Sequence, residues 1–296
     1  MKKIVFFLIV GFLLGYFGPK LTLQFKSSSA AKTAEQERSD IFAQINPEKG
    51  YLLNSSYGYL GPKMVTAGII DLNKFKNVYA QANQALTQNE LNILTNGSNK
   101  KIAINRQNSY FLLNFFWAVG LGNKTSILTN GDMTKYGQNQ VGNFASTGGW
   151  SLAAGNPIDY YAKSNLVSLT PAQEAKVLAV SSNIYRPCCN NPTSFPDCNH
   201  GMALLGLLEV MAAQGSSENQ MYEAAKYFNA FWFPTNYYDL AVYFKNKDGK
   251  SFAEVPGEVI LGKDYSSATG WQNIKQWLTA KGIEPPPSSQ GASCGV

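Results

Sequence analysis

Residues 198–215 read CNHGMALLGLLEVMAAQG, and this stretch decides the fold. It predicts a helix that begins near Asp197 or Asn199 and ends at the glycine at position 215. A helix that is apolar nearly all round is buried among other helices. Gly201 and Gly206 allow the backbone of a neighbouring element to approach closely. The sequence therefore predicts a mainly α fold, a single helical domain with minor β.

Helix signals recur on both sides of this segment. Thr87 with Glu90, and Thr170 with Gln173, each fit a capping box. The predicted helices span residues 71–82, 87–96, 108–119, 170–186, 197–215, 218–233, 236–245 and 270–280. Short strands are predicted at residues 102–104 and within residues 252–261, and residues 120–158, rich in Gly, Asn, Ser and Thr, are predicted to form a long irregular region.

A cysteine-rich loop at residues 187–202 leads into the helix. Three of the four cysteines of the chain and its only histidine fall within residues 188–200. Thiolates, an imidazole and a thioether can all bind a soft or borderline metal ion such as Cu(I) or Zn(II). The metal hypothesis takes as ligands Cys188, Cys189, Cys198 and His200, with Met202 and Cys294 as optional ligands. The N-terminus of the helix is expected to favour a thiolate at Cys198.

Two other interpretations stay open. Four cysteines are an even number, so one of Cys188 and Cys189 can pair with Cys198 and the other with Cys294. The protein would then be a disulfide-stapled surface scaffold or binding module without metal, with residues 120–158 facing a partner or glycan. A thiol redox protein with a reactive Cys198 beside His200 is the third interpretation, although no C-x-x-C motif is present.

No recognised catalytic motif accompanies the loop. The chain contains neither H-E-x-x-H nor G-x-S-x-G, and a single histidine restricts any histidine-dependent triad to His200. The sequence therefore favours a protein that is not an enzyme.

The N-terminus predicts a membrane anchor. Lys2 and Lys3 precede an almost wholly apolar run from Ile4 to Phe17, and no acidic residue occurs before position 35. This is the pattern of a signal peptide or of a short anchor, and the small residues that a peptidase requires do not follow directly. An uncleaved single-pass anchor with the rest of the chain outside the cytosol is favoured, with a cleaved signal peptide as the alternative.

The chain divides into four predicted parts. Residues 1–26 form the signal-anchor, residues 27–50 a stalk, and residues 51–284 a helical extracytoplasmic domain. Residues 285–296 form a flexible proline-rich tail that carries Cys294.

The net charge argues against a nucleic-acid partner. The formal charge of +6 includes four lysines before residue 27, where there are no acids, and residues 27–296 hold 21 basic and 19 acidic residues. Binding of nucleic acid requires a basic surface that this balance does not supply. The expected partners are the membrane, through the anchor, and a cell-wall or protein partner.

Two segments resemble a known family. The run from Pro187-Cys188-Cys189 to Cys198 and His200, and the end Gly-Ala-Ser-Cys-Gly-Val at residues 291–296, are similar to the PCYCGC-motif family of anchored bacterial extracytoplasmic proteins. The resemblance covers this loop and the tail only, and the chain has Cys-Cys in place of the family's alternating cysteines. It implies a protein of the bacterial cell membrane, anchored by a single pass, with a cysteine site outside the cytosol.

Overall fold

The computed structural model describes residues 35–137 and 140–283. The predicted anchor at residues 1–26, the start of the stalk and the tail with Cys294 lie outside the described residues. The chain divides into two compact units, Met1–Ala43 and Gln44–Val296. In the first unit, residues 35–43 are helical. Within the described ranges, no helix has the length and apolar character needed to cross a membrane.

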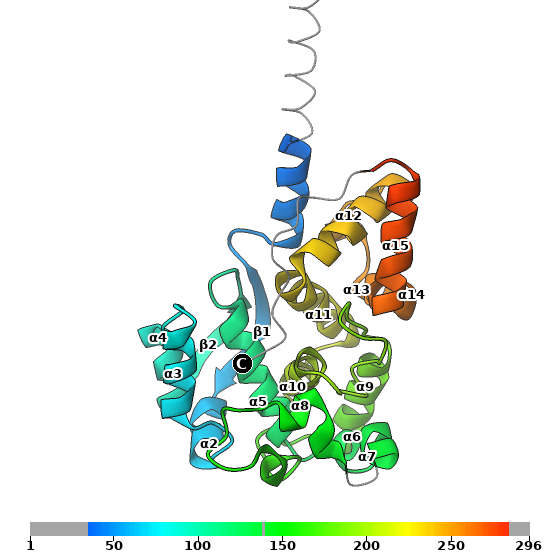
Figure 1. Cartoon of the computed structure of the whole chain (residues 1–296). Coiled ribbons are helices and arrows are strands. Elements are labelled where there is room, and N and C mark those ends of the chain that lie inside the picture. Colours follow the sequence, from blue (N-terminus) through cyan, green and yellow to red (C-terminus); the bar gives the residue numbers. More distant parts are fainter. Residues whose placement is uncertain (1–34, 138–139, 284–296) are drawn as a thin grey trace, which may run out of the picture. The chain divides into compact units, whose positions relative to one another are not determined.

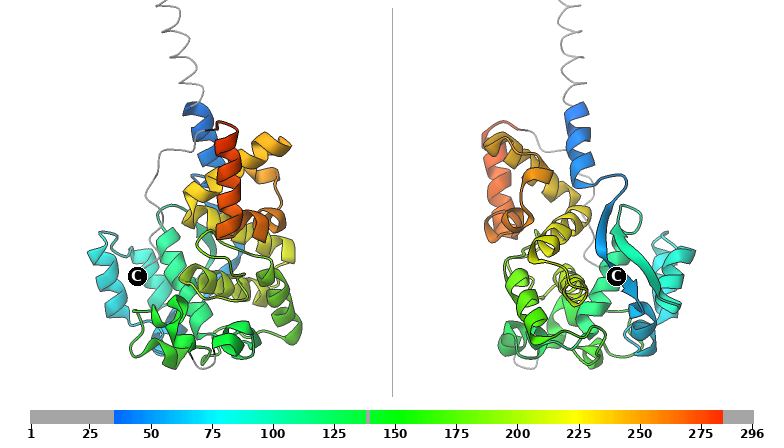
Figure 2. Two further views of the ribbon diagram at one scale, coloured as in Figure 1. Left: turned by 45° about the vertical axis from the view of Figure 1, so that its right-hand side comes forward. Right: turned by 180° about the vertical axis from the view of Figure 1, so that it is seen from behind.

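The second unit begins with a two-stranded antiparallel sheet. Strand β1 (Tyr51–Gly58) pairs with β2 (Ser98–Ile104), with Tyr51 opposite Ile104 and two irregularities along the register. The sheet and three helices, α2 (Leu60–Thr66), α3 (Leu72–Gln81) and α4 (Gln88–Thr95), lie on one side of this unit (Figure 2). The helices α12 (Pro234–Asp248), α13 (Gly257–Ile260), α14 (Lys263–Ser266) and α15 (Ala268–Ala280) lie on the other. The strand predicted at residues 102–104 forms the last part of β2, whereas β1 was not predicted.

The core of the unit is the pair of helices α5 (Ser109–Gly122) and α10 (Asn199–Ala213). Every residue of α10 up to Ala212 is buried, among α5, α8 (Ala145–Gly148), α9 (Pro171–Ser182) and α11 (Glu218–Trp232) (Figure 1). A Cβ atom on Gly206 would lie 2.4 Å from the carbonyl oxygen of Phe116 in α5. The predicted burial of this helix and the close approach at Gly206 are confirmed.

Capping side chains begin several of the helices, and both predicted capping boxes are confirmed. The Asp71 carboxylate accepts hydrogen bonds from the amides of Asn73 and Lys74, the second and third residues of α3 (Leu72–Gln81). Capping boxes at Thr87 and Thr170 begin α4 (Gln88–Thr95) and α9. The remaining elements are α2 (Leu60–Thr66), α6 (Ser126–Thr129), α7 (Asp132–Gly137), α12 (Pro234–Asp248), α13 (Gly257–Ile260), α14 (Lys263–Ser266), α15 (Ala268–Ala280) and the short 3-10 helices η1 (Val141–Asn143), η2 (Pro157–Tyr160) and η3 (Phe252–Glu254). The prediction of a mainly helical domain with minor β is confirmed.

Two local predictions are wrong. Residues 252–261 form η3 and α13 and contain no strand, because Glu254 accepts hydrogen bonds from the backbone and hydroxyl of Ser251 and starts a helical turn there. Residues 120–158 are not wholly irregular, since the described part of this region includes a series of single helical turns, α6 to η2. The helical elements in both regions are only three to six residues long, too short for helical periodicity to be recognised.

Candidate metal and thiol site

The cysteine loop connects α9 to α10 and is held by hydrogen bonds from distant elements. The amide of Thr193 donates to the carbonyl oxygen of Ile184 across the base of the loop, at 2.8 Å. The carbonyl oxygen of Cys189 accepts from the amide of Ala268 at the start of α15, at 2.9 Å, and that of Asp197 accepts from the α8 amide of Ser146. These contacts tie the loop to α15 and α8 at its two ends and to its own first residues at its middle.

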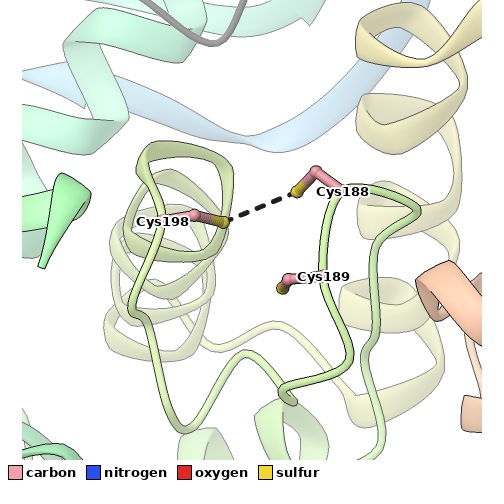
Figure 3. A group of neighbouring side chains, drawn as sticks. All are labelled: Cys188, Cys189 and Cys198. Atoms are coloured by element: carbon pink, nitrogen blue, oxygen red, sulfur yellow. Dashed lines mark hydrogen bonds between the residues drawn. The ribbon is translucent and has the colours of Figure 1, made fainter.

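The loop brings three thiols together. The Sγ atoms of Cys188, Cys189 and Cys198 all lie within 4.8 Å of one another, and the Cys188 and Cys198 sulfurs are 3.6 Å apart (Figure 3). Cys188 is exposed, the other two are half-buried, and all three are free thiols. Three converging sulfur ligands can hold a metal ion.

Arg186 organises the cluster and was not predicted from the sequence. Its guanidinium is fully buried and donates Nε–H to the Cys198 sulfur at 3.1 Å and Nη2–H to the Asp197 carboxylate at 2.7 Å. A further bond from Nη1 to the Asn191 carbonyl oxygen, at 2.9 Å, crosses the loop. A Cβ atom on Gly201 would lie 2.4 Å from Nη2, so glycine makes room for this side chain. The sequence signal that could have identified Arg186 is its position: it is one of three arginines in the chain and lies two residues before Cys188.

Cys198 is the N-cap of α10, which the sequence predicted to begin near Asp197 or Asn199. Its sulfur accepts from the amide of Gly201 at 3.4 Å, while Asp197 is engaged with Arg186. Sulfur in this position neighbours the positive end of the helix dipole, which stabilises negative charge.

The three thiols differ in acidity. Hydrogen bonds from the Cys188 and Cys189 thiols, together with the Arg186 guanidinium, hold the pKa of the Cys198 thiol well below its usual range. The hydrogen bonds that Cys188 donates raise the pKa of its own thiol. The hydrogen bond with Cys188 lowers the pKa of Cys189, but the bond to Cys198 and burial outweigh it and raise that pKa to about 11. The cluster therefore resembles one thiolate bound by two thiols and a guanidinium.

The structure does not bring His200 into the cluster. The imidazole is fully buried and packs on Phe233 and Trp232, with ring centroids 4.4 Å and 5.6 Å away. Neither ring nitrogen has a hydrogen-bond partner among the described residues, and burial lowers the pKa of His200 to about 4. Met202 is also fully buried, within the α5–α10 contact. Cys294 lies outside the described residues.

Comparison with protein-family models, with curated proteins and with solved structures finds no match for this chain. Any functional argument therefore depends on the geometry and chemistry of the residues themselves.

Proposed function

We propose that this protein is an anchored extracytoplasmic protein that binds a soft or borderline metal ion, Cu(I) or Zn(II), through Cys188, Cys189 and Cys198. The observation that carries the proposal is the convergence of three sulfur atoms within 4.8 Å of one another. Sulfur ligands select this group of metals over the hard cations that prefer oxygen. The anchored location follows from the apolar run after Lys2 and Lys3.

The sulfur spacing supports this proposal. With Zn–S bonds of about 2.3 Å, two sulfurs on one metal ion are about 3.8 Å apart in a tetrahedral site and about 4.0 Å apart in a trigonal one. The observed 3.6 Å between Cys188 and Cys198, and the 4.8 Å limit for the whole group, bracket these values. Small side-chain rotations that move the sulfur atoms by about an ångström would therefore complete the site.

The surrounding charge supports the same proposal. Binding requires deprotonated thiols, and a cluster of thiolates needs positive charge nearby. The buried Arg186 guanidinium and the N-terminus of α10 supply it on the Cys198 side. Three sulfur ligands leave one position of a tetrahedral ion open, on the side where Cys188 is exposed. We propose Cys294 of the tail, or a ligand from solution, for that position; His200 and Met202 would have to leave the core to reach it.

A second function is favoured by one specific observation. The 3.6 Å between the Cys188 and Cys198 sulfurs is short enough that a modest movement would bring them to the disulfide distance of about 2.05 Å, where an oxidant of the extracytoplasmic space would take up two electrons and two protons as the bond forms. A Cys188–Cys198 disulfide would close the loop that Arg186 already spans. In that case the protein is a stapled scaffold or a thiol redox protein, and it holds no metal.

Native mass spectrometry of the purified full-length protein distinguishes the two functions. Protein prepared without reductant should carry one copper or zinc ion and have all four cysteines as free thiols after chelation. The Cys198→Ser variant should lose the ion, and Ser182→Ala, the control at an exposed position on α9, should keep it. Cys294→Ser decides between the two candidates for the fourth position: weaker binding assigns it to Cys294, and unchanged binding assigns it to a ligand from solution. A metal-free protein that is two hydrogens lighter than its reduced form, with Cys188 linked to Cys198 in the fragment spectra of peptides cleaved before Asp197, would refute the metal proposal.

The proposed location has its own test. A protease added to intact cells should digest the domain, because the proposal places residues 27–296 outside the cytosol. Digestion that occurs only after the cells are broken would place the domain in the cytosol and contradict the anchor orientation.

A further inference from the structure

Two of the three thiols in the cluster are placed to form a disulfide with each other. The Cys188 and Cys198 sulfurs lie 3.6 Å apart, and their side chains point toward one another from the loop and from the start of α10 (Figure 3). The backbone disfavours a bond between Cys188 and Cys189, because neighbouring Cα atoms are about 3.8 Å apart and a disulfide needs about 4.4–6.8 Å. The favoured pair is therefore Cys188 with Cys198.

The two sulfurs of this pair differ in their access to solvent. Cys188 is exposed, whereas Cys198 is half-buried. The Cys198 sulfur accepts hydrogen bonds from the Arg186 guanidinium at 3.1 Å and from the amide of Gly201 at 3.4 Å. A dissolved oxidant therefore reaches Cys188 first, while Cys198 is held beside it as an internal nucleophile.

The groups around Cys198 make a disulfide at this position easy to reduce. The Arg186 guanidinium and the N-terminus of α10 stabilise negative charge on the Cys198 sulfur. That stabilisation belongs to the thiolate and is lost when the sulfur enters a neutral disulfide, so it favours the reduced form. Disulfides whose reduced form is stabilised have high reduction potentials, which is the property of labile disulfides and not of structural staples.

Several hydrogen bonds of the loop do not involve sulfur. Arg186 also donates to the Asp197 carboxylate at 2.7 Å and to the Asn191 carbonyl oxygen at 2.9 Å. The Asn191 amide donates to the second Asp197 oxygen at 2.8 Å, and the Cys189 carbonyl oxygen accepts from Ala268 at 2.9 Å. The loop therefore keeps its place when the pair is oxidised and when it is reduced again.

We propose that Cys188 and Cys198 form a reversible redox switch that releases the bound metal ion. This inference rests on the proposed function, and its oxidant is a low-molecular-weight disulfide. The exposed Cys188 thiolate attacks one sulfur of that disulfide and displaces the first small thiolate. The Cys198 thiolate then attacks the Cys188 sulfur and displaces the second. The two cysteines lose two electrons in total, and the small disulfide is reduced to two thiolates, which take up protons from water.

The new bond removes two of the three sulfur ligands. A metal ion binds thiolates, and a sulfur atom in a disulfide no longer carries that charge. Among the three clustered cysteines only Cys189 can then ligate, and it takes up a proton as the ion leaves. Reduction of the disulfide restores the three thiolates and with them the site.

Oxidised glutathione, added to the metal-loaded full-length protein, tests the switch. The protein is loaded with Zn(II), which has no redox chemistry, or with Cu(I) in the absence of oxygen if only copper binds. Native mass spectrometry should show loss of the ion as the protein becomes two hydrogens lighter. Fragment spectra of peptides cleaved before Asp197 should show Cys188 linked to Cys198. Excess reduced glutathione should reverse the bond, and the protein should bind one ion again after glutathione is removed.

Two variants test the order of the steps in metal-free protein, where loss of a ligand does not affect the result. With oxidised glutathione at about pH 8, Cys198→Ser should accumulate one glutathione on Cys188, because the internal nucleophile is gone. In Cys188→Ser, the less accessible Cys198 should be modified about tenfold more slowly than Cys188 is in Cys198→Ser. Adducts on Cys294 fall on a different peptide and are counted apart.

Ser182→Ala, at an exposed position on α9, is the control and should release its ion as the parent does. The switch is refuted if the ion stays bound in excess oxidised glutathione, if the disulfide includes Cys189, or if reduced glutathione does not reverse it. Faster modification of Cys198 than of Cys188 would overturn the order of attack. Failure of the proposed function shows earlier, as a protein that binds neither copper nor zinc before any glutathione is added.

Discussion

Replacing Glu209 with glutamine should remove a pH dependence from the stability of this protein. Glu209 is fully buried in the middle of α10, where its Oε2 accepts from the amide of Asn123 at 2.9 Å. Burial raises the pKa of this carboxyl from 4.5 to about 8. The folded protein therefore keeps a proton on Glu209 that the unfolded chain releases near pH 4.5.

The sign of the effect follows from this difference in proton binding. Below pH 4.5 both states hold the proton, and the stability that the neutral carboxyl allows is fully present. Between pH 4.5 and pH 8 only the folded state holds it, so the free energy of unfolding falls as pH rises, by about 1.4 kcal/mol per pH unit. The loss between pH 5 and pH 8 is about 4 kcal/mol, and above pH 8 it levels off.

Glu209→Gln keeps the shape of the neutral acid without its titration. The glutamine carbonyl oxygen can accept from Asn123, and its amide can donate to the buried hydroxyl of Thr125. The free energy of unfolding can be measured by urea denaturation at pH 5, 6, 7 and 8. From pH 5 to pH 8, that of the variant should rise relative to that of the parent by about 4 kcal/mol. Every titratable group that the two proteins share, His200 included, cancels in this difference.

Glu258→Gln, at an exposed position on α13, is the matched control and should follow the parent at every pH. Parallel curves for the parent and Glu209→Gln would refute the reasoning, because they would mean that Glu209 is already ionised in the folded protein.

Three further outcomes are expected. Arg186→Met should destabilise the protein by about 3 kcal/mol in urea denaturation, since a buried ion pair is lost. It should also slow the alkylation of Cys198 at neutral pH, since the charge beside the sulfur is lost. An unchanged alkylation rate would show that the guanidinium does not stabilise the thiolate. Gly206→Ala should lower the free energy of unfolding by about 2 kcal/mol, because its Cβ would lie 2.4 Å from a backbone oxygen. Gly142→Ala is the control and should be nearly neutral, because its Cβ would have no neighbour nearer than 3.8 Å. Equal melting temperatures for the two variants would contradict the close helix contact. Lys226→Met should lower the free energy of unfolding by about 2 kcal/mol, because two hydrogen bonds of the buried ammonium are lost. The ammonium donates to the Glu223 carboxylate at 3.1 Å and to the Val255 carbonyl oxygen at 2.8 Å. A variant as stable as the parent in thermal unfolding would show that the cost of burying the charge offsets both bonds.

Local chemistry made most of the helices predictable. The cap residues Asp71, Thr87 and Thr170 satisfy backbone amides within three positions of themselves, so their effect is visible in a short window of sequence. The apolar composition of residues 201–213 likewise required burial, whatever surrounded it.

The strands were harder because pairing is not local. In β1 the buried positions include the polar Ser55, while Leu52 is exposed, so the alternation that marks a strand is weak. Its partner β2 lies some forty residues further along the chain, and no short window contains both. Residues 252–261 carried strand-like apolar residues, but the capping box at Ser251 decided for a helical turn.

For the site, the sequence by itself determined which residue types are close along the chain: three cysteines, a histidine and a methionine within residues 188–202. Only the tertiary structure decided which of them meet. The packing of α10 against α11 turns His200 toward Phe233 and away from the sulfurs, and the buried Arg186 draws Cys198 toward the loop. Side-chain direction depends on the neighbours that a helix acquires on folding, which a one-dimensional spacing does not contain.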